Sequence, residues 1–144
     1  MNIQSIAAGT SPSVTSKPLT TVVPVVGRAM ISAIFLLSGM SKLAAPAMTI
    51  GYIQSVGLPL PSVAFALSAF VEIVGGIALL LGFRTRAVAG VLALFSLATA
   101  VFFHNTLGDQ NQFIHFFKNV AIAGGLLQIV AFGGGRISLD ARRG

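Results

Sequence analysis

The sequence predicts an all-α integral membrane protein: a bundle of four transmembrane helices with both termini on the cytoplasmic side. The first observation is composition, since 55% of the residues are hydrophobic and only 8% are charged, against about a quarter charged in a soluble domain. A small soluble globule has too much surface to hide such a share of apolar residues. The second observation is a series of four apolar segments, each near the ~20 residues that cross a hydrocarbon core.

The apolar segments divide the chain into a membrane domain and two tails. Residues 1–21 are rich in Ser, Thr and Pro, which is typical of a disordered cytoplasmic tail. The membrane domain is expected at 22–135, and 136–144 is expected to be a basic cytoplasmic tail. The expected spans are about 22–44, 62–82, 87–104 and 113–133.

The connections between the expected spans differ in character. Residues 45–61 contain no charge and are expected to form an amphipathic loop, whereas 82–86 is expected to be a tight hairpin. Residues 105–112 read as a polar turn. No internal repeat is evident, and the chain contains no cysteine, which excludes disulfides and iron–sulfur clusters ligated by this chain.

The third observation is the placement of basic residues, which predicts the orientation. With four spans, one side of the membrane has Lys17, Arg28, Arg84, Arg86, Arg136, Arg142 and Arg143. Only Lys42 lies near the opposite surface, so the basic side is expected to be cytoplasmic. The net charge of +6 therefore reflects orientation, and without a basic stripe or aromatic platform we expect no nucleic-acid partner.

An alternative for the first span is a cleaved signal peptide. Arg28 precedes the apolar run MISAIFLLSG, and cleavage would fall near Ala45 or Ala47. A leader with 27 residues before its basic residue is long, and Lys42 is unfavourable just before a cleavage site. We therefore favour a membrane span.

Ionisable residues inside the expected spans are candidates for function, because a charge in lipid is costly unless it is paired or hydrated. Glu72 lies near the middle of 62–82, too deep to reach either surface. Its helical face consists of Ser68, Ala69, Gly75 and Gly76, and such small residues favour close helix packing. We expect Glu72 to point into the bundle, either as a structural partner of Arg28 or Lys118 or with a direct role in function.

The remaining candidates are basic or are histidines. Arg28 and Lys42 share one face of the first span, each near a membrane edge, where a long side chain can also simply reach water. Lys42, Glu72, His104, His115 and Lys118 are all expected in the outer half of the membrane. This cluster has an excess of positive charge, which favours an anion or the polarised oxygen of a quinone. We expect no metal, and the His104–His115 spacing is too unspecific to predict a haem.

Several strings resemble the DoxX family of small bacterial inner-membrane proteins. They are GRAMISAIFLLSGMSKLAAP, GYIQSVGLPLP, FVEIVGGIALLLGFRTRAVA, FFHN, HFFKNVAIAGGLLQ and GGGRISLD, which span about 25–140. The resemblance implies a multi-pass inner-membrane location. The family is similar to small membrane subunits of archaeal thiosulfate:quinone oxidoreductase, which implies a quinone-linked redox role. The resemblance also implies that Arg28, Lys42, Glu72, His104 and Lys118 are the motif positions of the family.

Three functions are compatible with these observations. In the first, the chain is a quinone-linked redox component, with quinone as a non-covalent cofactor. Lys42, Lys118, His115 and Arg28 would bind the quinone or an anionic substrate, and Glu72 with His104 would transfer protons. In the second, it is a non-catalytic membrane subunit that anchors redox or stress-response enzymes. The third is a small-solute transporter, which four spans would form only as a homo-oligomer. The expected partners are the lipid bilayer and either another protein or a second copy.

Overall fold

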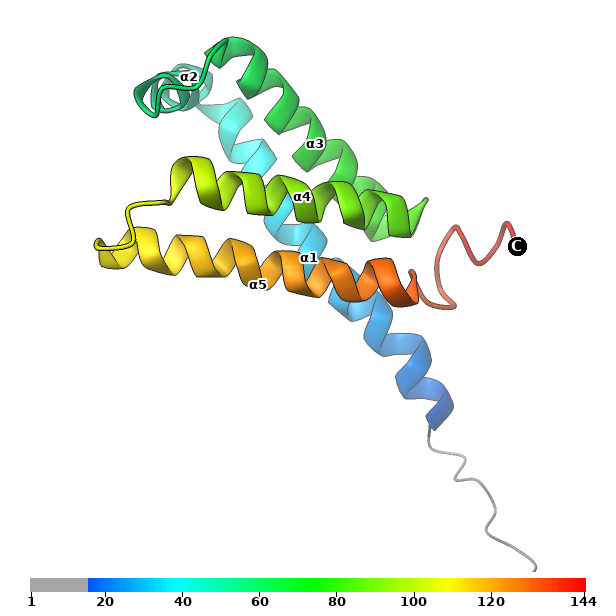
Figure 1. The fold of residues 1–144 in the computed structure, drawn as a ribbon. Helices are drawn as coiled ribbons and strands as arrows, with labels where there is room; N and C mark the ends of the chain where they lie inside the picture. The colour runs from blue at the N-terminus through cyan, green and yellow to red at the C-terminus, as the bar shows by residue number, and fades with distance from the viewer. Residues whose placement is uncertain (1–15) are drawn as a thin grey trace, which may run out of the picture.

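The computed structural model describes residues 16–144, and in this part of the chain every regular element is a helix (Figure 1). Its elements, in chain order, are α1 (Ser16–Ala44), α2 (Pro46–Ser55), α3 (Pro61–Leu81), α4 (Thr85–Phe103) and α5 (Gln110–Phe132). Four of these are long and apolar enough to cross a membrane, namely α1, α3, α4 and α5. The predicted fold class, an all-α membrane bundle, is confirmed.

The helix ends lie close to the expected span boundaries, except at the start of the chain. Helix α1 begins at Ser16, so residues 16–21 of the expected tail are helical. The earlier part of that tail lies outside the described residues. Pro24 lies inside α1 without ending it.

The expected loop at 45–61 is half helical, and here the prediction was wrong. Pro46 occupies the first turn of α2, where its missing N–H has no helical partner to lose. The helix ends at Ser55, and Gly57 follows with a φ of 79°, a left-handed conformation that glycine adopts without strain. The prolines and glycines of this segment therefore bound a short helix; they do not mark a continuous loop.

The bundle consists of two tightly packed helix pairs. Helix α1 packs on α3, and α4 packs on α5, while α1 and α5 touch only slightly. In Figure 1, α4 and α5 run side by side and α1 crosses them at an angle. Glycines permit the close α1–α3 approach, since a Cβ on Gly39 would lie 2.6 Å from Ile73 Cγ1 and one on Gly76 would lie 3.0 Å from the Leu36 side chain.

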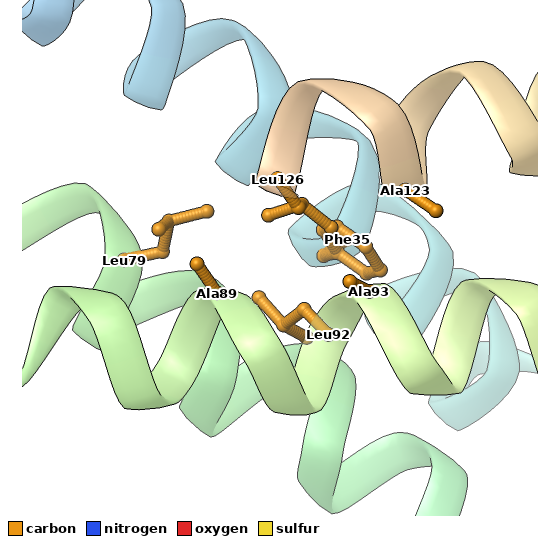
Figure 2. Close-up of a cluster of buried hydrophobic side chains, with 7 residues drawn as sticks. All are labelled: Phe35, Leu79, Ala89, Leu92, Ala93, Ala123 and Leu126. Carbon is orange, nitrogen blue, oxygen red and sulfur yellow. The ribbon is translucent and has the colours of Figure 1, made fainter. Parts of the chain in front are cut away.

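A small apolar core joins the two pairs (Figure 2). Leu79, Leu92 and Leu126 are fully buried, and they come from α3, α4 and α5. Phe35 of α1 completes the contact with Ala89, Ala93 and Ala123. Many large apolar side chains instead face outward, for example Leu94 at 71% exposure. Apolar side chains therefore cover the outer surface as well as the core, as expected for a helix bundle surrounded by lipid.

The chain after α5 folds back onto the ends of α3 and α4. Gly82 ends α3 with a φ of 70°, and Phe83 N–H donates to Ala78 O at 2.9 Å, which is a Schellman-type end. Leu139 N–H donates to Leu81 O at 3.1 Å, and Asp140 N–H donates to Gly82 O at 2.9 Å. These bonds satisfy carbonyls that a helix end leaves open. The segment expected as a basic tail is thus attached to the bundle.

Candidate functional site

A cavity of about 650 Å³ lies among all five helices, between the α1–α2–α3 part of the chain and the α4–α5 pair. We call it the five-helix cavity. Most of its lining is apolar, including Phe35, Leu67, Phe95 and Phe102. Its polar lining comes from every helix: Ser38, Ser41, Lys42, Thr49, Tyr52, Ser68, Glu72, Thr99, His104, Lys118 and Asn119. An apolar cavity with a few convergent polar groups is the usual form of a small-molecule site.

Glu72 is the buried acid of this cavity, with only 4% of its surface exposed. The Lys42 ammonium donates to both of its carboxylate oxygens at 2.7 Å, and the Ser38 hydroxyl donates to Oε1 at 3.0 Å. The same ammonium also donates to the Ser38 hydroxyl at 3.0 Å. Within residues 18–144 this is the only ion pair closer than 4.0 Å. The carboxylate is therefore paired and hydrogen-bonded, as a buried charge must be.

The inward orientation expected for Glu72 is confirmed, but its expected partner was wrong. Neither Arg28 nor Lys118 forms the ion pair; Lys42 does. The reason is the close α1–α3 contact at Gly39, where a Cβ would lie 3.3 Å from Glu72 Cβ. Lys42 follows Gly39 by one helical turn, so its side chain lies on the face of α1 that meets α3.

The second lysine of the cavity, Lys118, has a different environment. Its ammonium lies 2.9 Å from His115 Nδ1, and no carboxylate lies within 4.0 Å of it among residues 18–144. His115 in turn stacks on His104, with ring centroids 5.0 Å apart. His104 Nδ1 lies 2.9 Å from Gln112 Oε1, which joins the ends of α4 and α5.

The structure therefore brings together most of the sequence-predicted site. Lys42, Glu72, His104 and Lys118 line the cavity, and His115 lies behind it, in contact with His104 and Lys118. The two histidine rings meet face to face, and no group of three or more His, Asp or Glu suited to a metal occurs among residues 16–144.

Arg28 is the predicted site residue that lies elsewhere. It is 2% exposed, and its Nη2 donates to Ile137 O at 2.6 Å in the segment that follows α5. It does not line the five-helix cavity. Fourteen residues separate Arg28 from Lys42 on the same helical face, so Arg28 lies near the middle of α1 and Lys42 near its end, about 21 Å apart along the axis.

Several polar residues of the cavity lining escaped sequence reasoning, and two of them form contacts between cavity elements. Ser38 bridges Lys42 and Glu72, and its position four residues before Lys42 on one helical face was the available signal. Tyr52 of α2 donates its hydroxyl to Phe103 O at 3.2 Å and packs on the Phe103 ring, which attaches α2 to the end of α4. No signal pointed to Tyr52, because α2 itself was not expected.

The lining suits a molecule with an apolar body and a polarised oxygen. The Lys118 ammonium can donate hydrogen bonds to such an oxygen, and the apolar walls can cover a ring and the start of a tail. His104 Nδ1 faces the Gln112 carbonyl oxygen, which only accepts, so the neutral ring donates there and its Nε2 is an acceptor.

Comparison with known proteins gives consistent matches. The model of the DoxX family matches residues 23–105. The chain is similar to the inner membrane protein YphA of Escherichia coli (strain K12), with 35% identity over 81% of this chain and 87% of that protein. It is also similar to the inner membrane protein YqjF of the same organism, with 34% identity over 86% of this chain and 94% of that protein. No solved structure matches the chain significantly.

Proposed function

The chain belongs to the DoxX family of inner-membrane proteins, and from this premise we propose that it is a quinone-linked redox component whose five-helix cavity binds the quinone. One observation carries the proposal: Lys118 lines a largely apolar cavity of about 650 Å³, and no carboxylate of residues 18–144 lies within 4.0 Å of it. A lysine charge at membrane depth is costly unless something balances it. The polarised carbonyl oxygen of a quinone supplies that balance.

Lys42 and Lys118 would have different roles in the cavity. The Lys42 charge is compensated by Glu72, so this pair fixes the shape and polarity of one wall. Lys118 retains ammonium protons to donate, and it is the group that would meet the quinone oxygen. His104, also in the lining, would lie beside it with Nε2 as an acceptor, because its Nδ1–H donates to Gln112 Oε1. The apolar side chains around them would exclude water and so strengthen the hydrogen bond from Lys118.

Proton transfer would use the acid and the histidine of the cavity. Reduction of a quinone to a quinol takes two electrons and two protons. Glu72 and His104 would relay the protons: each would first accept a proton from water at the membrane surface and then pass it to the quinone. The electrons would come from an anionic sulfur donor: two thiolate-type sulfurs couple into one sulfur–sulfur bond and release two electrons. The balance is two donor anions, one quinone and two protons giving one coupled product and one quinol.

Quinone binding can be tested separately from turnover. Protein purified in a mild detergent is titrated with decylubiquinone, and extracts of the native preparation are analysed for quinone by mass spectrometry. Lys118→Met removes a charged hydrogen bond worth about 1.5–3 kcal/mol, so we expect affinity to fall roughly 10- to 100-fold. Arg142→Gln removes one charge far from the cavity and should bind quinone like the wild type. Equal affinities of Lys118→Met and wild type would contradict the proposed site.

Turnover tests the redox part of the proposal. The protein in lipid vesicles receives decylubiquinone and thiosulfate, and quinol formation is followed by absorbance. We expect reduction that is lost in Glu72→Gln while quinone binding is retained. Binding without any reduction would overturn the redox step and leave a quinone-binding membrane subunit.

A further inference from the structure

A second concave surface lies at the opposite end of the bundle from α2. It is a groove of about 740 Å³ between the start of α4, the end of α5 and the segment that folds back after α5. We call it the arginine groove. Its charged lining is Arg84, Arg86, Arg136 and Asp140, and its floor includes Gly133, Gly134 and Gly135. The proposed quinone function uses none of these residues.

The one acid of the arginine groove is already engaged. Asp140 Oδ1 accepts from Arg84 N–H at 2.7 Å, and Oδ2 accepts from the Thr85 N–H at 2.7 Å and the Thr85 hydroxyl at 2.6 Å. These bonds cap the first turn of α4 from a residue 55 positions away. No guanidinium lies within 4.0 Å of the Asp140 carboxylate among residues 18–144. The three arginines of the groove are thus not paired with it.

A fourth guanidinium lies beneath the groove floor. Arg28 is 2% exposed, and its Nε and Nη1 have no hydrogen-bond partner in the described part of the chain, residues 16–144. Its Nη1 lies against Gly134, where a Cβ would be 3.2 Å away. The Thr85 hydroxyl would be 2.7 Å from the same Cβ. A glycine at this position therefore lets the backbone lie directly on the buried charge, so the floor of the groove has a positive potential from below.

The surroundings of the groove are apolar and belong to the membrane surface. Phe132, the last residue of α5, lines the groove and is 79% exposed. The groove lies where α4 begins and α5 ends, and both are membrane-spanning helices. A ligand bound here would have its charge among the arginines and any attached chain along the lipid-facing surface of the bundle.

We propose that the arginine groove binds the phosphate head group of an anionic phospholipid. The guanidiniums of Arg84, Arg86 and Arg136 supply planar paired donors that match phosphate oxygens. The buried Arg28 adds a charge that has no carboxylate within 4.0 Å among residues 18–144, with Asp140 acting on it only from a longer distance. A lipid is favoured over free phosphate because the exposed Phe132 and the adjoining span ends provide a path for acyl chains. The lipid would then join the end of α5 to the start of α4 across the groove.

The test compares two double variants with equal loss of charge. Arg86→Gln with Arg136→Gln removes two guanidiniums from the groove, whereas Arg142→Gln with Arg143→Gln removes two that do not line it. Full-length protein in a neutral detergent is titrated with dioleoyl-phosphatidylglycerol, and bound lipid is counted by native mass spectrometry. Dioleoyl-phosphatidylcholine is the comparison lipid, and near-wild-type quinone binding shows that each variant is folded.

We expect one tightly bound phosphatidylglycerol in the wild type and at least a tenfold loss of affinity in the groove variant. The control variant should lose no more than twofold. Equal losses in the two variants would overturn the proposal, because attraction would then follow net charge alone. Inorganic phosphate should fail to displace the lipid at tenfold excess; displacement would contradict a lipid site and indicate a free-anion site. Equal retention of phosphatidylcholine would also contradict it.

Discussion

The two ends of the bundle handle a buried charge in different ways. At the five-helix cavity, Glu72 is matched by Lys42 at 2.7 Å, and the two come from helices that pack tightly through Gly39. At the arginine groove, Arg28 is equally buried, but its Nη2 donates to the Ile137 carbonyl, and its Nε and Nη1 have no acceptor among residues 16–144. The charge at the cavity has a carboxylate in direct contact, whereas the charge at the groove has only the more distant Asp140.

The two ends therefore differ in the role of their buried charge: one forms an ion pair in a cavity wall, and the other adds to a group of arginines. The paired Glu72 and Lys42 stabilise the wall of a site and leave Lys118 as the group available to a ligand. The groove instead gathers positive charge around a glycine loop and uses its only acid to cap α4. Substitutions at the two ends should therefore differ in their cost to stability.

The largest effect is expected from breaking the ion pair. Lys42→Met leaves the Glu72 carboxylate buried without its cation, and we expect a loss of about 3–5 kcal/mol in the free energy of unfolding. Unfolding in mixed micelles followed by circular dichroism measures it. Lys118→Met, the same substitution at the exposed lysine of the cavity, should cost less than about 1 kcal/mol. Similar losses in the two variants would remove the distinction between the paired and the available lysine.

A smaller effect is expected at the other end. Arg28→Met removes the hydrogen bond to Ile137 O, worth about 1.5–3 kcal/mol for a charged donor, but it also removes a buried charge that lacks a carboxylate partner. The loss in free energy of unfolding should therefore be smaller than for Lys42→Met in the same assay. The reverse order would show that the groove compensates its charge as well as the cavity does.

Helix packing at the cavity end can be tested without changing any charge. A methyl group at Gly39 would meet Ile73 Cγ1, so Gly39→Ala should force α1 and α3 apart and cost about 1–3 kcal/mol. Gly27→Ala is the matched control in the same helix, because its Cβ would meet nothing within 4 Å. It should gain roughly 0.5–1 kcal/mol from helix propensity. Equal effects of the two substitutions would contradict a close α1–α3 contact.

The sequence predicted four apolar helices long enough to cross a membrane, because the length of an apolar segment is a local property of the sequence. It also predicted that Glu72 points inward, since the 3.6-residue period determines the face it shares with small residues. Which of three cations pairs with Glu72 could not be predicted, because that choice depends on which helices pack together. Likewise Asp140 lies 55 residues from the helix that it caps, and nothing near it in the chain marks that role. The orientation of the termini and the roles of the site residues stay predictions.

The smallest effect concerns acid pH at the groove end. The hydrogen bonds from the Thr85 hydroxyl and backbone hold the pKa of the Asp140 carboxyl below its ordinary value of 3.8. A lowered folded-state pKa contributes stability above the unfolded value, and this stability is lost as the pH falls through the folded value. Hydrogen exchange should therefore show the Leu139 and Asp140 amides protected at neutral pH and increasingly open below about pH 3.8, after correction for the intrinsic rate. In Asp140→Asn that acid-induced change should be absent.

Photolabelling tests the proposed quinone site most directly. The protein in lipid vesicles is irradiated with a photoreactive quinone analogue, and the labelled peptides are identified by mass spectrometry with and without excess decylubiquinone. We expect labelling of cavity-lining peptides that contain Lys42, Tyr52 or Lys118, and we expect that labelling to be lost on competition. Labelling spread over the lipid-facing surfaces, or unchanged by the competitor, would contradict a quinone site in the five-helix cavity.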